Sequence, residues 1–264
     1  MSGEAATLPM AEDTQQHGDR DNAEYAFGRI RSEILTGQLA PGTVLSQANL
    51  ARALGISRTP LREALNRLVS EGLVIGGEYN QRMRVSELDL DDFDQIYAAR
   101  IALEPIAIVT TVALLDDGAK HELDIHLSAM DAAIESLDLE AFRNHHRLFH
   151  MGLTSLAGDR IDRLLTDLWD NSERYRLAYL HYDYSTRGDA LVERLEVSQH
   201  EHRVMRDAAI AGDGKSCATV LVAHLTRTLD AVFADAADIP RPRVAHQAIA
   251  QHKANFPVPE IPGR

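Results

Sequence analysis

Four histidines in the second half of the chain have the chemistry and the spacing that metal coordination requires. His146 and His150 lie four residues apart on one predicted helix, so their imidazoles share a face. His202 and His224 lie on two later predicted helices. Three helices of one bundle could therefore gather imidazole nitrogens around a divalent metal ion, with Zn²⁺ favoured and Ni²⁺ or Mn²⁺ as alternatives.

The spacing of the histidines leaves other assignments open, because the chain contains 12 of them. Several neighbours could also take part in a metal site: His121, His126, His145 and His200. Alternatively, each histidine is a surface residue or a hydrogen-bonded core residue.

A second group of chemically capable side chains lies at the start of a short helix near the N-terminus. Ser57 is its expected N-cap, and Pro60 falls in its first turn, where a missing N–H costs nothing. Apolar residues at helical spacing form one stripe: Leu61, Ala64, Leu65 and Leu68. Polar residues lie off that stripe: Arg58, Thr59, Arg62 and Asn66.

Guanidinium groups and a hydroxyl at the leading end of a helix suit base reading in the major groove of DNA. We predict that Arg58 and Arg62 contact guanine and that Thr59 contacts a base or a phosphate. Ser57 and Asn66 belong to the same predicted DNA-binding set. The alternative is an amphipathic helix whose arginines are solvated.

The neighbouring elements predict a winged helix-turn-helix. A preceding helix runs from Ser46 to Gly55, and an earlier apolar stripe ends at Gly37. After the arginine-bearing helix, residues 73–75 and 83–85 read as two short strands joined by a turn. Arg82 would then lie on the wing, where it could touch phosphate or the minor groove.

The rest of the chain predicts an all-α bundle of about six helices, so the fold class is mainly α. Turn signals separate the helices, which we place at 89–114, 118–136, 139–157, 159–182, 189–211 and 214–235. We divide the chain into a disordered tail (1–22), the winged helix-turn-helix (23–87), the bundle (88–238) and an extended C-terminal tail (239–264).

Charge and composition fit a cytoplasmic DNA-binding protein with an acidic body. The net charge is −13, yet residues 24–88 hold eight arginines and only six acidic residues. The acidic remainder should repel DNA and make binding strongly salt-sensitive. A single cysteine suits a reducing cytoplasm, and the longest apolar stretch, 101–115, is too short to span a bilayer.

The N-terminal motifs resemble the GntR family of bacterial transcription regulators. The resemblance rests on residues 34–42 (ILTGQLAPG) and 50–74 (LARALGISRTPLREALNRLVSEGLV). The family usually carries an Asn-Arg-Gly pattern at the wing tip, whereas this chain has Asn80-Gln81-Arg82. The wing geometry is therefore expected to differ.

The helical region resembles the FCD ligand-binding domain of the FadR subfamily, through Tyr97–Glu104, Phe149-His150, Glu201–Asp213 and His224-Leu225. Many members bind a metal through an aspartate and three histidines. The resemblance carries the three histidines over to His150, His202 and His224, and places His146 where the family has the carboxylate. It also implies that Arg100 holds an organic acid in the cavity; alternatively, Arg100 and Glu104 form an exposed ion pair.

These features predict a repressor that binds a palindromic operator as a homodimer and is released by a small carboxylate. Catalysis is not expected, because Arg147 stands where an H-E-x-x-H zinc enzyme has its general base. The rival functions are a metal-dependent enzyme fused to a DNA-binding head and an architectural DNA binder. Neither a membrane role nor a membrane partner is expected.

Overall fold

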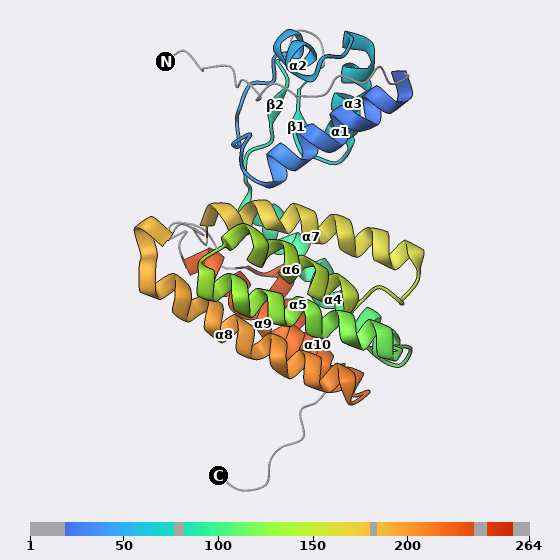
Figure 1. Ribbon diagram of the computed structural model, residues 1–264, viewed down its shortest axis with the longest axis vertical. Helices are drawn as coiled ribbons and strands as arrows, with labels where there is room; N and C mark the ends of the chain where they lie inside the picture. The colour runs from blue at the N-terminus through green and yellow to red at the C-terminus, as the bar shows by residue number, and fades with distance from the viewer. Residues whose placement is uncertain (1–18, 77–81, 180–183, 235–241, 256–264) are drawn as a thin grey trace, which may run out of the picture. The chain divides into compact units, whose positions relative to one another are not determined.

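The computed structural model describes residues 19–76, 82–179, 184–234 and 242–255. The contacts divide the chain between Asp89 and Leu90 into an N-terminal unit and a C-terminal unit (Figure 1). The fold class is the predicted one: a winged helix-turn-helix with a small sheet, followed by a helical bundle.

The N-terminal unit consists of α1 (Asp19–Leu35), α2 (Gln47–Leu54), α3 (Arg58–Ser70), β1 (Val74–Ile75) and β2 (Arg84–Val85). The strands pair antiparallel, with Val74 opposite Val85 and Ile75 opposite Arg84. The turn between them, residues 77–81, lies outside the described residues, and so do Asn80 and Gln81 of the predicted departure at the wing tip. Of the tail predicted to be disordered (1–22), residues 1–18 also lie outside them, whereas residues 19–22 belong to α1.

The turn between α2 and α3 follows the predicted signals, with one exception. The Ser46 hydroxyl accepts a hydrogen bond from the Asn49 N–H at 3.4 Å, and Gly55 ends α2 with φ at 66° in the left-handed region. Ser57 occupies the N-cap position of α3, but its side chain makes no capping hydrogen bond. The predicted N-cap position of Ser57 is therefore confirmed, but its predicted side-chain capping bond is not formed, and the residue is exposed.

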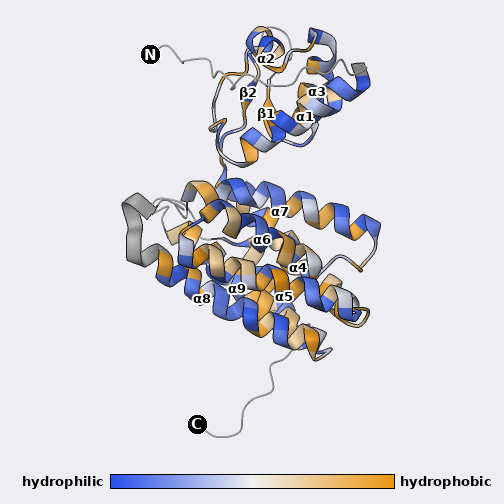
Figure 2. Ribbon diagram, in the orientation of Figure 1, coloured by the Kyte–Doolittle hydropathy of each residue, from blue (hydrophilic) through white to orange (hydrophobic). Residues whose placement is uncertain are grey.

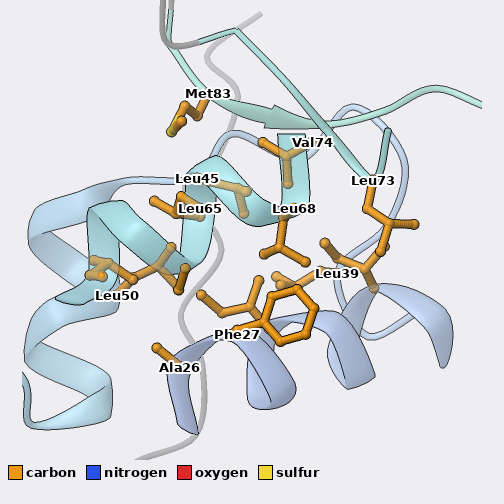
Figure 3. Packing of buried hydrophobic residues seen from close by; sticks show 14 of the residues in the cluster. Ala26, Phe27, Leu39, Leu45, Leu50, Leu65, Leu68, Leu73, Val74 and Met83 are labelled. Atoms are coloured by element: carbon orange, nitrogen blue, oxygen red, sulfur yellow. The ribbon is translucent and has the colours of Figure 1, made fainter. Parts of the chain in front are cut away.

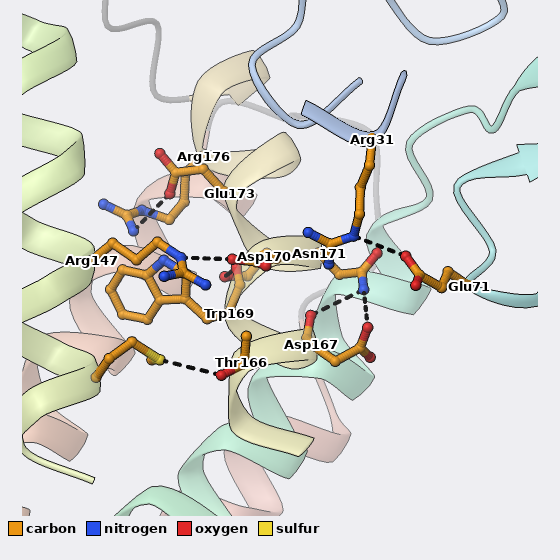
Figure 4. A network of polar contacts seen from close by, with 12 residues as sticks. Arg31, Glu71, Arg147, Thr166, Asp167, Trp169, Asp170, Asn171, Glu173 and Arg176 are labelled. Carbon is orange, nitrogen blue, oxygen red and sulfur yellow. Dashed lines mark hydrogen bonds and ion pairs between the residues drawn. The ribbon is translucent and has the colours of Figure 1, made fainter. Parts of the chain in front are cut away.

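The arginine-bearing helix, α3, lies with its apolar stripe in the core of the N-terminal unit (Figure 3). Polar contacts also hold it against α1. The guanidinium of Arg67 lies 3.8 Å from the centroid of the Phe27 ring and pairs with Glu24 at 2.6 Å. Near the end of α3, Arg31 donates to Glu71 at 2.9 Å (Figure 4). These contacts fix one side of α3 and leave its arginine-bearing side exposed.

The C-terminal unit contains α4 (Leu90–Val112), α5 (Asp117–Ser136), α6 (Leu139–Gly152), α7 (Asp159–Tyr179), α8 (Tyr184–Ile210), α9 (Gly214–Ala234) and α10 (Val244–Asn255). Helix α4 packs against α7, α9 and α10, while α8 packs against α5 and α9, and α5 also packs against α6. Most of these helices are apolar on one side and polar on the other (Figure 2). The turn signals locate the starts of α5 and α6 because side chains cap these helices. Asp116 and Asp138 accept hydrogen bonds from the N–H groups of Ala119 and Ala141 at 2.8 and 2.9 Å.

Helix α8 begins earlier than the sequence predicts. The expected break at residues 185–189 lies inside α8, whose first residue is Tyr184. Gly188 lies within that expected break. A glycine inside a helix costs only about 1 kcal/mol relative to alanine, so it weakens a helix without ending it.

The prediction of an extended C-terminal tail (239–264) is also wrong in part, because some of these residues form α10. Asp94 of α4 caps this helix: its carboxylate accepts hydrogen bonds from three consecutive backbone N–H groups, those of Arg243 and Val244 at 2.9 Å and of Ala245 at 2.8 Å. Only Ala245 and Ile249 supply buried apolar side chains on α10, which is too short a stripe to recognise in the sequence. Residues 256–264 lie outside the described part of the chain.

Removing the Asp94 carboxylate should detach α10 from α4. We expect Asp94→Ala to lower the free energy of unfolding by about 1–3 kcal/mol, because it leaves three backbone donors without their acceptor. Denaturant unfolding measures the loss, and amide hydrogen exchange should show faster exchange in α10. Asp94→Asn keeps one acceptor oxygen and should lose less; equal protection of α10 in all three proteins would contradict this role.

Two helices, α4 and α9, are long and apolar enough to cross a membrane by length and composition alone. They pack against each other, and 61% and 44% of their most apolar windows are buried within the protein. Burial in the bundle core accounts for their composition.

Cys217, the single cysteine of the chain, lies fully buried on α9. Burial, with a smaller contribution from Asp213, raises the pKa of its thiol to about 12. The reactive thiolate is therefore scarce at neutral pH.

Candidate DNA-reading surface and metal centre

The predicted DNA-reading residues share the exposed side of α3. Four side chains there are open to solvent: Arg58, Thr59, Arg62 and Asn66. Ser57, just before the helix, and Arg82, two residues before β2, are exposed as well. Glu63, which sequence analysis left unassigned, lines the same shallow groove as Arg62 and Asn66. A carboxylate there could accept a hydrogen bond from a cytosine amino group.

The four predicted metal-binding histidines come together in the C-terminal unit: His146, His150, His202 and His224. We call them the histidine cluster. All four are buried, and one nitrogen of each lies within 4.8 Å of the others. The Nε2 atoms of His150 and His202 are 3.2 Å apart. Two nitrogens on one tetrahedral ion, each about 2.1 Å from it, would lie about 3.4 Å apart, so this spacing fits a shared ion.

The remaining histidines named in the sequence analysis do not join the cluster. His126 and His145 contact each other, with their Nδ1 atoms 3.2 Å apart, on α5 and α6. His121 and His200 are exposed. The structure thus distinguishes among assignments that spacing left open.

Burial holds the clustered imidazoles in the neutral form. Desolvation, aided by the neighbouring imidazoles and by arginines, holds the pKa of His146, His150 and His202 well below the ordinary value. The pKa of His224 is also lowered, chiefly by burial, although Glu201 opposes the shift. A neutral imidazole offers the lone pair that a metal ion needs.

Two of the imidazoles are oriented by acceptors on α8. The amide nitrogen of Gln199 donates to the Leu127 carbonyl at 3.0 Å. This contact directs the amide oxygen of Gln199 toward Nδ1 of His202, 3.1 Å away. The carboxylate of Glu201 lies 2.9 Å from Nδ1 of His224. Both contacts place a proton on Nδ1 and leave Nε2 with its lone pair, as in many metal-bound histidines.

Glu201 stays ionised in this setting. Burial alone would raise its pKa, but the hydrogen bonds from His224 and from Arg227 outweigh that effect, and the pKa is lowered.

His146 has a different kind of neighbour. Its Nδ1 lies 3.2 Å from Nη2 of Arg176 on α7, and Arg176 also pairs with Glu173 at 3.0 Å (Figure 4). Among the described residues, Nε2 of His146 has no hydrogen-bond partner.

Arg100 lies buried on α4, so the alternative of an exposed ion pair with Glu104 is wrong. Its Nε donates to Glu104 at 2.5 Å and its Nη1 donates to Ser172 at 3.1 Å, whereas Nη2 has no partner in the described part of the chain. The guanidinium lies 4.6 Å from the centroid of the Trp169 ring. The same ring lies 4.8 Å from that of His150.

A small cavity of about 60 Å³ adjoins the histidine cluster. His224, Arg176 and Arg227 contribute to its lining. A cavity of this size holds several water molecules or a small polar group.

Sequence reasoning missed the residues that orient the cluster. Gln199 precedes His202 by one turn of α8, a spacing that could have marked it as a partner. Glu201 is adjacent to His202 in sequence yet orients His224, and Arg176 comes from a different helix. The spacing of residues along one helix does not reveal which side chains of another helix will contact it.

The comparisons with known proteins fit this arrangement. Residues 22–76 match the model described as bacterial regulatory proteins, gntR family, and residues 95–227 match the FCD domain. A Streptomyces ambofaciens protein described as an uncharacterized HTH-type transcriptional regulator in an unstable DNA locus is 31% identical over 221 residues, which are 81% of this chain and 86% of that protein. The HTH-type transcriptional repressor GlaR of Escherichia coli is 28% identical over 206 residues, 74% of this chain and 89% of its own.

A solved structure shows the same fold. That of E. coli McbR/YncC matches with a TM-score of 0.69 and 26% identity, covering 81% of this chain and 97% of that one. These relatives are regulators rather than enzymes. The chain belongs to the GntR family of bacterial transcription regulators, as a ligand-responsive DNA-binding protein whose FCD domain fits the FadR-type subfamily.

Proposed function

We propose that this regulator is a cytoplasmic repressor that binds a palindromic operator as a homodimer and releases it when a small carboxylate enters a metal-containing pocket. The observation that carries the proposal is the two-sidedness of α3. Its apolar stripe is buried, while Arg58, Thr59 and Arg62 remain exposed at its leading end.

On DNA, α3 would lie in the major groove. Arg58 and Arg62 would form paired hydrogen bonds with guanine, and Asn66 would reach a base one turn further on. Ser57 and Thr59 would contact phosphate at the groove edge, and Arg82 would contact the backbone through the wing. One such helix reads only a few base pairs, so two copies related by a two-fold axis would read a palindrome.

The histidine cluster would hold the metal through Nε2 of His202 and His224 together with His150. Their spacing, neutral state and orientation by Gln199 and Glu201 fit a divalent ion, and an all-nitrogen set favours Zn²⁺, with Ni²⁺ or Mn²⁺ as alternatives. When bound, the metal would supply a positive charge that attracts a carboxylate.

Arg100 would hold the other end of that carboxylate. Its Nη2 is a buried donor without a partner among the described residues, and a guanidinium pairs well with a carboxylate. Helix α4, which carries Arg100, begins after only four residues, 86–89, that follow β2 of the wing. A short stretch of backbone therefore joins the wing to the helix that carries Arg100.

For release, the carboxylate must favour the arrangement of the two heads that cannot bind DNA. A preference of about 1–3 kcal/mol would lower operator affinity roughly 5- to 150-fold.

Operator selection from a random duplex pool tests the proposal. We expect purified protein to enrich one palindrome, bound as two copies per duplex in analytical ultracentrifugation. Fluorescence anisotropy should then show that some small carboxylates in a screened panel weaken binding, and that a chelator removes this response. Enrichment of no sequence would rule out the repressor, and a response that is indifferent to chelation would rule out the metal's part in it.

A further inference from the structure

We infer that His146 is not a ligand of the metal but a fixed hydrogen-bond donor beside it, which selects an anion with two or more oxygens for the positions that the other three histidines leave open. This inference rests on the proposed metal function. One oxygen of the anion would bind the metal, and another would accept the hydrogen bond from Nε2–H of His146.

The contact with Arg176 fixes the tautomer of His146. A guanidinium has only donors, so Nδ1 of His146, 3.2 Å from Nη2 of Arg176, must be the acceptor. A neutral imidazole with an acceptor at Nδ1 carries its proton on Nε2. His202 and His224 carry the opposite tautomer, protonated on Nδ1, because an amide oxygen and a carboxylate face their Nδ1 atoms.

Ligation by His146 would require breaking this arrangement. Binding through Nε2 would move the proton to Nδ1, which would then face a guanidinium N–H, donor against donor. Binding through Nδ1 is obstructed by Arg176, and Glu173 holds Arg176 in place with an ion pair at 3.0 Å. His146 therefore stays a donor in the presence of the metal.

Two buried donors near the cluster lack partners among the described residues: Nε2 of His146 and Nη2 of Arg100. Their side chains are only 2% and 1% exposed, so water from bulk solvent does not reach them freely. Both groups lie against Trp169, whose ring is 5.2 Å from that of His146 and 4.6 Å from the guanidinium of Arg100. Buried donors without acceptors are costly, so these two mark where an acceptor belongs.

The charge of the site also calls for an anion. Three neutral imidazoles leave the full charge of a divalent ion uncompensated, and a buried unpaired charge is strongly unfavourable. The nearby carboxylates already have cationic partners: Glu104 pairs with Arg100, Glu173 with Arg176, and Glu201 with Arg227. Metal and anion should therefore bind cooperatively, each raising the affinity for the other.

The first test measures Zn²⁺ affinity by competition with a chromophoric chelator. His146→Leu has no lone pair to give a metal, yet we expect one full equivalent of Zn²⁺ with affinity within about threefold of the wild type in buffer without small carboxylates, whereas His202→Leu should lose more than about 100-fold. His145→Leu, on the same helix but outside the cluster, is the matched control. A loss in His146→Leu as large as in His202→Leu would overturn the inference.

The second test measures binding of malonate to the Zn²⁺-loaded proteins by calorimetry. His146→Leu removes the donor and should weaken malonate binding about tenfold, whereas His146→Gln restores an N–H and should stay within about threefold of the wild type. Malonate should also raise the Zn²⁺ affinity of the wild type. Equal malonate affinity in His146→Leu and the wild type would refute the donor role. Failure of the wild type to bind Zn²⁺ at all would instead refute the proposed metal function, and circular dichroism would show which variants fold.

Discussion

The double substitution His202→Ala and His224→Ala should abolish metal uptake. These residues would supply two of the three Nε2 ligands, and the remaining nitrogens are too few to hold a divalent ion at micromolar concentration. Elemental analysis of the purified variant should show no bound metal, against one equivalent in the wild type. A full equivalent in the double variant would show that the metal binds elsewhere.

Thermal unfolding gives an independent reading of the same variant. Metal at 100 times its dissociation constant stabilises a folded protein by about 2.7 kcal/mol, so a chelator should lower the melting temperature of the wild type. The double variant should melt at one temperature with or without chelator. His121→Ala combined with His200→Ala removes two exposed histidines outside the cluster and should behave like the wild type.

Arg62→Ala should weaken operator binding by about 1–3 kcal/mol, or roughly 5- to 150-fold in affinity. Arg62 is on the exposed side of α3, so its removal would delete the proposed base contact without disturbing the core of the unit. Fluorescence anisotropy with the selected operator measures the loss, and the melting temperature should not change. Unchanged affinity would remove Arg62 from the contact surface.

A lysine at the same position separates charge from base recognition. Arg62→Lys keeps the positive charge and should retain the salt dependence of binding, but it lacks the planar fork that pairs with guanine. We expect it to lose discrimination between the operator and unrelated DNA. Arg29→Ala is a control, because Arg29 is an exposed arginine on α1 rather than on α3 and pairs with Glu33.

The helix-turn-helix was predictable because its signals are local. Ser46 and Gly55 mark the ends of α2 through contacts within a few residues, and the apolar stripe of α3 follows from helical spacing. Helix α10 was not predictable in the same way. Its capping residue, Asp94, lies on another helix, and the residues next to Val244 give no sign of that contact.

The histidine cluster was predictable only in part. The spacing gave His146 and His150 a shared face and placed His202 and His224 on two later helices, but it left four other histidines as candidates, and the resemblance to the family was needed to select among them. The proton positions depend on Arg176 and Glu201, which reach the imidazoles from across the bundle. The sequence thus indicated which side chains assemble, whereas the hydrogen bonds between helices decide what each nitrogen can do.

The inert thiol of Cys217 makes the native chain ready for site-directed labelling. Because that sulfur is buried and protonated, a cysteine introduced at exposed Ser70 would be the one that reacts with a maleimide or a nitroxide reagent. A spin label there would report the distance between the two copies of α3 in the proposed dimer. Recording that distance before and after adding a small carboxylate would test the proposed switch without removing a native side chain from the core.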